Sequence, residues 1–327
     1  MILRQNLRAE RLLYGFVMAA IFVAACLIAG CSGNENAAAT IAPTSTPIPT
    51  EEPLVITDAL GQALSFESAP TRIAAISPTA TEMLYLAGGT SILRDRASNF
   101  PDEVTAIPDV GSAYNPSIEM IVAERPDLVI IEALTQARFA KIFADAGLRV
   151  MAVKAETLED IKKGISGIGI LIGESDRASE RVSDIEDRII GAGSDDGRSV
   201  LTLISDQDNN LYAARPESYT GLITDTVGMV NKAAGLPDSG PYPGFAMMAP
   251  EMVLMANPDI ILTISPAPEP APRLSVLLTH IPPYAGLKAM QTGGVIEVDV
   301  ALFLQAPGPR IVDAVEFLKQ RLSKESS

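Results

Sequence analysis

The feature that most constrains the fold of this chain is a sequence pattern that occurs twice. Glu119 stands seven residues before Pro126-Asp127, Glu251 stands seven residues before Pro258-Asp259, and an apolar run follows each pair. Each copy predicts a two-turn helix that ends at proline and leads into a buried strand, because proline cannot continue a helix. The copies lie 132 residues apart, so we expect two lobes of similar build.

Apolar runs alternate with helical stretches elsewhere in the chain. Residues Arg72–Ser77 and Ser199–Ser205 read as buried strands, while Thr79–Ala87 and Leu222–Ala234 read as helices that stop at glycine. Uninterrupted apolar strands between helices are typical of parallel sheets covered on both faces. The sequence therefore predicts an α/β fold with two lobes, each built on a central, mostly parallel sheet.

A long helical segment is predicted between the lobes. Thr157 and Asp160 have the spacing of a capping box, and apolar residues keep helical spacing as far as Ile172. Gly173 is expected to break the helix, and the glycines at 164, 167 and 169 indicate tight packing. We expect an N-terminal lobe over residues 54–155, a connecting backbone helix over 156–193 and a C-terminal lobe over 194–327.

The first residues have the organisation of an export signal. Arg4, Arg8 and Arg11 are followed by the uncharged, mostly apolar stretch Leu12–Gly30. We predict a signal peptide over residues 1–30. An uncleaved transmembrane anchor is the alternative, since this stretch is nearly long enough to span a bilayer. Both interpretations place the rest of the chain outside the cytoplasm, because the arginine cluster stays inside.

Composition limits the possible partners. Residues 31–53 are rich in Ala, Thr, Ser and Pro without an apolar period, which predicts a disordered tether. The chain has 25 basic and 40 acidic residues, a formal net charge of −15, which argues against a nucleic-acid partner. Its two cysteines, Cys26 and Cys31, both lie near the start, so we expect no disulfide in the exported part.

Several segments carry a resemblance to known families. The run 28–31, Ile-Ala-Gly-Cys, resembles the lipobox of bacterial lipoproteins, which implies cleavage before Cys31 and a lipid on its thiol. In order and spacing, residues 54–322 resemble the substrate-binding proteins of ABC importers for cobalamin, ferric siderophores and haem, whose lobes are joined by a helical backbone. The segments that carry this match are Thr57–Gly61, Arg72–Glu82, Asn115–Glu119, Arg125–Val129 and Ala306–Arg310.

The resemblance implies a function. A monomeric receptor, anchored by lipid on the extracytoplasmic side of a membrane, would capture a metal-chelate ligand between its lobes and deliver it to a permease dimer. Glu119 and Glu251 match the positions at which family members dock on permease arginines. The alternative for these two residues is an ordinary surface charge near the start of a helix.

Candidate ligand-binding residues follow the carboxyl ends of the predicted strands, where ligands of parallel sheets bind. Aromatic side chains suit a macrocycle and arginines suit a carboxylate or phosphate, although each is also compatible with ordinary packing, and Arg310 with ordering the final turn. The candidates are Ser77, Thr79, Tyr114, Asn115, Tyr212, Arg215, Tyr242, Phe245, Phe303 and Arg310.

Other chemistries fit the sequence poorly. His280 is the only histidine, which excludes metal sites built from several histidines, and its surroundings suggest a helix end. Residues 164–168 do not complete a G-x-S-x-G nucleophile motif, so we expect no enzyme and no resident cofactor or metal. A membrane-tethered ligand sensor for a signalling partner is the alternative function, and a hydrolase that uses carboxylates alone is a further alternative. Cobalamin or another corrinoid, a ferric siderophore and haem all remain open as ligands. The absence of tryptophan and the scarcity of basic residues disfavour a highly anionic siderophore, and we favour a corrinoid.

Overall fold

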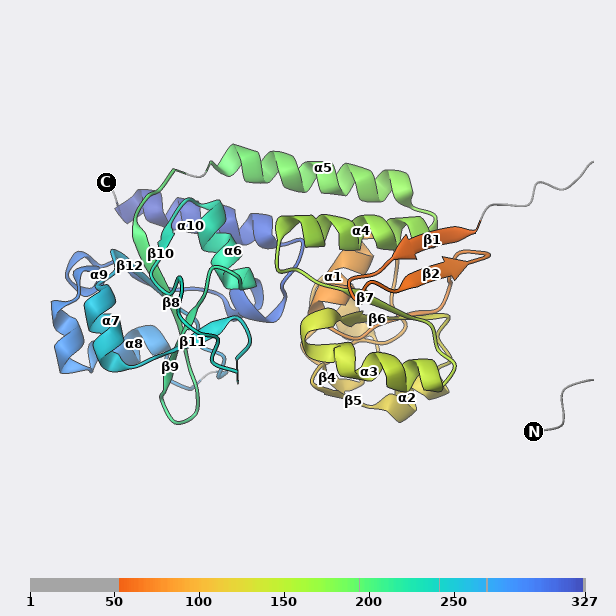
Figure 1. The fold of residues 1–327 in the computed structure, drawn as a ribbon, viewed down its shortest axis with the longest axis horizontal. Helices are drawn as coiled ribbons and strands as arrows, with labels where there is room; N and C mark the ends of the chain where they lie inside the picture. Colours follow the sequence, from red (N-terminus) through yellow and green to blue (C-terminus); the bar gives the residue numbers. More distant parts are fainter. Residues whose placement is uncertain (1–52, 194, 241, 269, 326–327) are drawn as a thin grey trace, which may run out of the picture. The chain divides into compact units, whose positions relative to one another are not determined.

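A computed structural model describes residues 53–325 of the chain, except 194, 241 and 269. The predicted signal peptide, nearly all of the tether and Cys31 lie outside the described residues. The fold is α/β with two lobes, as predicted (Figure 1). Among the described residues, no helix is both long enough and apolar enough to cross a membrane.

The first lobe is built on a three-stranded parallel sheet in the order β3-β6-β7. Its strands are β3 (Ile73–Ala75), β6 (Leu128–Glu132) and β7 (Val150–Val153). Two antiparallel pairs join it: β1 (Leu54–Thr57) with β2 (Ala63–Phe66), and β4 (Gly111–Ser112) with β5 (Asn115–Pro116). The helices of this lobe are α1 (Pro78–Ala87), the 3-10 helix η1 (Asp102–Ala106), α2 (Ile118–Ala123) and α3 (Ala133–Asp145).

The second lobe has a mixed six-stranded sheet. The parallel strands are β8 (Ser199–Ser205), β10 (Val230–Asn231), β12 (Ile260–Thr263) and β13 (Val295–Glu297). The strands β9 (Leu211–Ala214) and β11 (Phe245–Met248) extend one edge in antiparallel fashion. The helical segments are α6 (Tyr219–Thr226), α7 (Pro250–Ala256), α8 (Leu274–Thr279), η2 (Pro282–Gly286), α9 (Lys288–Thr292), η3 (Ala301–Gln305) and α10 (Ile311–Glu325).

The connector consists of two helices, α4 (Leu158–Ile172) and α5 (Ser175–Ala192). The predicted capping box at Thr157 forms, and Gly173 ends α4 with a φ of +77°. A Cβ placed on Gly169 would lie 2.3 Å from the Cβ of Ala178, so the two helices approach as closely as backbones allow and the expected tight packing is confirmed.

Helix α5 is tied to the second lobe by charge. The Arg188 guanidinium lies 2.7 Å from Asp313 Oδ1 and 2.8 Å from Glu316 Oε1, both on α10. One buried apolar cluster contains residues of both lobes and of the connector, for example Met83, Ile165 and Val315. The connector is therefore part of a shared core, while two further clusters cover the remaining sheet faces.

Two local predictions are wrong. The predicted helix Leu222–Ala234 is shorter and begins earlier, as α6, because Gly228 takes a φ of +84° and the chain then enters β10. Tyr212, predicted to follow the end of a strand, instead lies within one, because residues 211–214 form β9. The Tyr-Ala-Ala part of this strand lacks the branched residues typical of strands, and pairing with β8 and β11 decides its conformation.

Candidate functional site

Exposed apolar side chains gather after the strands of the first lobe. Tyr114, in the turn between β4 and β5, is 66% exposed, and Leu134, in the first turn of α3, is 54% exposed. Glu132 caps α3 by accepting hydrogen bonds from the N–H groups of Leu134 and Thr135, each at 2.8 Å. Partial burial and then the Glu132 carboxylate raise the pKa of Tyr114. Asn115 is also exposed, so this surface combines one phenol, one aliphatic group and one amide.

The second lobe contributes an aromatic pair and a methionine. The rings of Tyr212 and Tyr242 lie 4.7 Å apart and are tilted by 59°. The Tyr212 hydroxyl donates a hydrogen bond to Asp206 Oδ2 at 3.0 Å. Tyr212 and Phe245 are buried, whereas Met247 on β11 is 55% exposed. Met247 is therefore the exposed apolar side chain of β11, whereas the rings of Tyr212 and Phe245 belong to the buried interior.

Arg215 does not have a free guanidinium. It lies 3.2 Å from Glu217 Oε2 and 3.3 Å from Asp238 Oδ2. Asp238 also accepts hydrogen bonds from the N–H groups of Gly240 and Gly244, and these bonds, then Arg215, lower its pKa. The charge of Arg215 is thus neutralised inside the second lobe.

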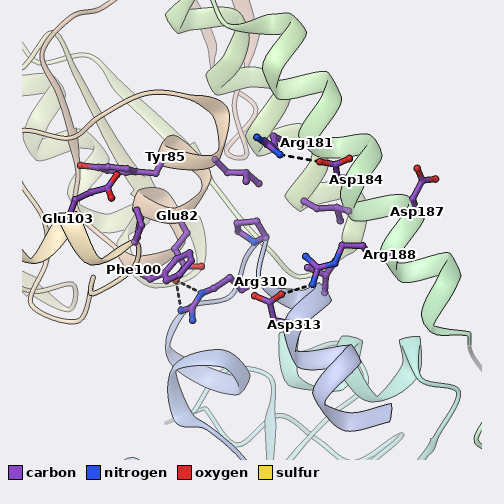
Figure 2. Close-up of a pocket in the computed structure, with 15 residues that line it drawn as sticks. Glu82, Tyr85, Phe100, Glu103, Arg181, Asp184, Asp187, Arg188, Arg310 and Asp313 are labelled. Carbon is purple, nitrogen blue, oxygen red and sulfur yellow. Dashed lines mark hydrogen bonds and ion pairs between the residues drawn. The ribbon is translucent and has the colours of Figure 1, made fainter. Parts of the chain in front are cut away.

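Arg310 is also paired. Its Nε and Nη2 donate to the same oxygen, Oε1 of Glu82 on α1, at 2.9 and 2.5 Å (Figure 2). Its guanidinium carbon lies 4.5 Å from the centre of the Phe100 ring. A cavity of about 510 Å³ opens beside this pair, lined by α1, α5 and the segments around Phe100 and Pro309. Of the ten predicted ligand residues, Arg310 alone lines it.

Three further predicted ligand residues, Ser77, Thr79 and Phe303, are also buried. Ser77 caps α1 by accepting from the Ala80 N–H at 3.1 Å, and Thr79 is 1% exposed. Phe303 is fully buried, with its ring 6.1 Å from that of Phe317. This burial assigns Phe303 to packing and Ser77 to helix capping, which their sequence positions alone do not distinguish from ligand contacts.

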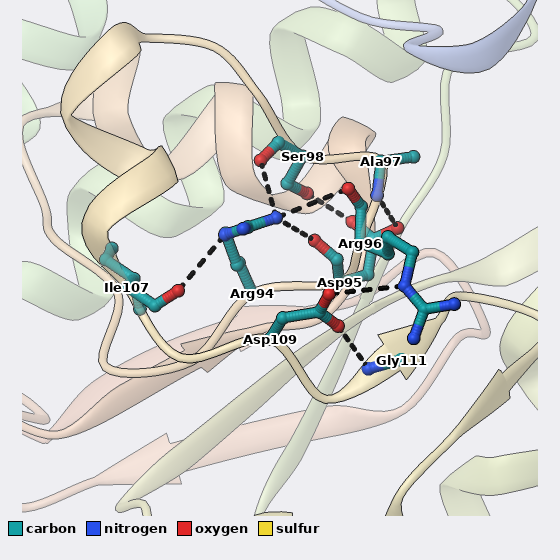
Figure 3. Close-up of polar contacts among 8 residues, drawn as sticks. All are labelled: Arg94, Asp95, Arg96, Ala97, Ser98, Ile107, Asp109 and Gly111. Carbon is teal, nitrogen blue, oxygen red and sulfur yellow. Dashed lines mark hydrogen bonds and ion pairs between the residues drawn. The ribbon is translucent and has the colours of Figure 1, made fainter. Parts of the chain in front are cut away.

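A polar network, which sequence reasoning missed, holds the loop that carries Phe100 (Figure 3). Arg94 donates to the carbonyls of Asp95 and Ile107, both at 3.1 Å. The buried Asp95 carboxylate accepts from the N–H of Ala97 at 2.9 Å and from the Ser98 hydroxyl. Burial raises the pKa of Asp95. The side chains of Arg94, Asp95 and Ser98 thus hold this loop in place through their hydrogen bonds.

The predicted docking glutamates occupy equivalent places. Glu119 lies in the first turn of α2 and Glu251 in the first turn of α7, and both are exposed. Both helices are followed by a non-glycine residue with positive φ, Arg125 at 47° and Asn257 at 36°. The duplicated pattern is thus a duplicated structure, one copy per lobe.

No group of His, Cys, Asp and Glu side chains among the described residues is arranged to hold a metal ion. His280 caps the end of α8, as predicted, and its Nδ1 lies 3.0 Å from the carbonyl oxygen of Val276. The predicted candidates therefore include one exposed phenol and one exposed amide, together with arginines that are already paired, and the exposed apolar side chains of Leu134 and Met247 lie outside the predicted set.

The two-lobed fold and the duplicated helix–strand element define a binding protein of the type with a helical connector. The chain matches the Periplasmic binding protein family over residues 73–302 and belongs to that family. It is 25% identical to an uncharacterized ABC transporter substrate-binding lipoprotein, YvrC, of Bacillus subtilis, over 94% of this chain and 96% of that protein.

Two further proteins are similar. A cobalamin-binding protein of Halobacterium salinarum is 23% identical, over 80% of this chain and 72% of that protein. The solved structure of the periplasmic heme-binding protein BhuT, in complex with two hemes, has a TM-score of 0.68 at 21% identity and covers 80% of this chain and all of that one. The latter similarity supports the fold.

Proposed function

We propose that this protein captures a metal-chelate ligand between its two lobes outside the cytoplasm and delivers it to the permease of an ABC importer. The observation that carries the proposal is the membership of residues 73–302 in the periplasmic binding protein family. The similarity to a substrate-binding lipoprotein over nearly the full length supports the same function. In this proposal the protein is a receptor and has no catalytic residues.

The ligand proposed is a corrinoid, in preference to haem or a ferric siderophore. Arg215 and Arg310, the two arginines predicted to meet an anion, are both neutralised by acidic side chains. An anionic ligand would have to break these pairs. The exposed groups Tyr114, Leu134 and Met247 suit a large ligand with apolar edges and little net charge. The similarity to a cobalamin-binding protein points the same way.

Delivery is proposed to use Glu119 and Glu251 as one docking carboxylate per lobe. Neither forms a salt bridge with a described residue, so both are available to a partner's arginines. A lipid on Cys31 is proposed to hold the receptor close to the permease, raising its local concentration rather than its affinity.

Calorimetric titration of the purified full chain with cyanocobalamin, haemin and a ferric catecholate tests the ligand class. We expect cyanocobalamin to bind most tightly. Tyr114→Ala should weaken that binding, while Ile190→Ala, which removes another exposed apolar side chain on α5, should not. Failure of all three compounds to bind at micromolar concentrations would contradict the proposed ligand class.

A further inference from the structure

The cavity beside Arg310 lies where three parts of the chain meet. It has a volume of about 510 Å³ and is lined by α1 of the first lobe, by the connector helix α5 and by the start of α10 in the second lobe (Figure 2). Small-molecule sites usually have volumes of about 300–1,000 Å³, so the cavity is large enough to hold one. Tyr114, Leu134 and Met247, the exposed side chains assigned to the proposed chelate, do not line it.

Glu82 brings an unused acceptor to this cavity. Both donors of Arg310 go to Oε1 of Glu82, whereas Oε2 has no hydrogen-bond partner among the described residues. The Glu82 side chain lines the cavity and is 2% exposed. A buried carboxylate oxygen without a donor is costly. Burial raises the pKa of Glu82 although Arg310 lowers it, so one guanidinium does not fully offset the burial of this carboxylate. A ligand with a positively charged donor would complete the pairing.

The charged side chains around the cavity also favour a cation. Five are acidic and three are basic: Glu82, Glu103, Asp184, Asp187 and Asp313 against Arg181, Arg188 and Arg310. Each arginine lies within 3.2 Å of one of these carboxylates. Glu103 and Asp187 are exposed, form no salt bridge with a described residue and lie on opposite sides of the cavity in Figure 2. The excess of negative charge attracts cations and repels anions.

Much of the remaining lining is apolar. Tyr85 and Leu86 come from α1, Ile185 from α5 and Val312 from α10. An apolar group placed against these side chains would be removed from water, which favours binding. The cavity thus combines apolar walls with one buried acceptor, and this combination matches an amine that carries an apolar body.

We propose that the cavity is a second ligand site, which binds an organic amine through its ammonium group at Glu82 Oε2 and its apolar body at Leu86 and Ile185. Such a ligand would contact the first lobe and the connector at once. It would favour the arrangement of lobes described here, because a ligand shifts a protein toward the state that it binds best. This site does not rest on the proposed function, since none of its residues is assigned to the chelate there.

Calorimetric titration of the purified full chain with phenethylammonium tests the site. Phenethyl alcohol and phenylacetate keep the aromatic ring but carry a neutral hydroxyl or a carboxylate in place of the ammonium group. We expect the amine to bind at least about tenfold more tightly than either, because a hydrogen bond between charged groups is stronger than a neutral one. Equal binding of the three compounds, or no binding of the amine at millimolar concentration, would overturn the proposal.

Two variants locate the bound amine. Glu82→Gln, folded by circular dichroism, should weaken its binding at least about tenfold, because it removes the charge at Oε2. Leu86→Trp, which fills the apolar part of the cavity and keeps Glu82, should abolish binding and decides the matter if Glu82→Gln does not fold. The matched control is Leu60→Trp, at a 38% exposed leucine between β1 and β2, which should bind the amine normally. Unchanged binding by Leu86→Trp would refute the site.

Cyanocobalamin distinguishes this site from the proposed function. Protein saturated with cyanocobalamin should still bind phenethylammonium, and strict competition between the two would show one shared site and overturn the second. Failure of cyanocobalamin, haemin and the catecholate to bind would contradict the proposed function and leave the amine titrations unaffected.

Discussion

Asp127 and Asp259 make the same contact in the two lobes. Asp127 Oδ2 accepts hydrogen bonds from the N–H and hydroxyl of Thr71, at 2.9 and 3.1 Å, just before β3. Asp259 Oδ2 accepts from the N–H and hydroxyl of Ser199, at 2.8 and 2.6 Å, at the start of β8. Each Pro-Asp pair therefore fastens its own strand to the beginning of the neighbouring parallel strand, which gives the duplicated sequence pattern a structural purpose.

These hydrogen bonds predict a pH-dependent stability. Hydrogen bonds from the N–H of Arg72 and then from Thr71 lower the pKa of Asp127, and hydrogen bonds from Lys288 and Ser199 lower that of Asp259. A carboxylate whose pKa is lower in the folded than in the unfolded state stabilises the folded protein above the unfolded pKa of about 3.8. This stabilisation is lost as the pH falls below that value toward the folded-state pKa. Asp259→Asn should lower the unfolding free energy by about 2 kcal/mol at pH 7. In urea titrations this difference should shrink below pH 3.8; Asp208→Asn, in an exposed turn, should have little effect at either pH.

The approach of α4 to α5 predicts opposite effects for two glycines. Gly169→Ala would bring a methyl group against Ala178 and should destabilise the protein by about 2 kcal/mol, as overpacking typically does. Gly191→Ala, on the exposed side of α5 with nothing within 4 Å, should stabilise it by about 0.5–1 kcal/mol. Thermal unfolding of both variants measures the difference. Equal effects would show that the close approach is not a constraint.

Docking through two carboxylates predicts a loss of transport without a loss of binding. Glu119→Ala together with Glu251→Ala should leave ligand affinity unchanged and abolish uptake into cells, because close charge pairs across an interface are coupled by about 1.5 kcal/mol or more each. The control is Asp176→Ala with Glu180→Ala, which removes the same charge from exposed positions on α5. Normal uptake by the Glu119 and Glu251 double variant would refute the docking assignment.

Arg215 and Arg310 are each paired with acidic side chains, so we expect ligand binding to depend little on salt concentration. A corrinoid held by Tyr114, Leu134 and Met247 should change its affinity by less than about twofold between about 0.05 M and 0.5 M salt, since screening acts mainly on exposed charges. A steep decrease in affinity with salt would instead indicate that one arginine leaves its acidic partner to meet an anion. Fluorescence quenching by cyanocobalamin at several salt concentrations measures this dependence.

The sequence predicted features that depend on local patterns. The ends of α1 and α4 at Gly88 and Gly173, the capping box at Thr157 and the helix end at His280 follow from short-range backbone rules. Repetition revealed the two lobes, because a pattern that recurs in the same order reflects the same local packing twice.

Features that depend on distant partners could not be predicted in this way. Glu82 looks like an ordinary helical glutamate until Arg310 is placed beside it. The short strand β9 exists because it pairs with β8 and β11. Candidate ligand residues were chosen by position along the chain, which does not separate a buried ring such as Phe303 from an exposed one.

The attachment of α5 at both ends affects how an importer would use this receptor. One end packs against α4 through Gly169 and Ala178, and the other is held to α10 by Arg188. With α5 attached at both ends, we expect Glu119 and Glu251 to keep nearly the same separation in loaded and empty protein. Under the proposed docking, empty receptors would then compete with loaded ones for the permease, and the rate of uptake would fall when receptor outnumbers ligand.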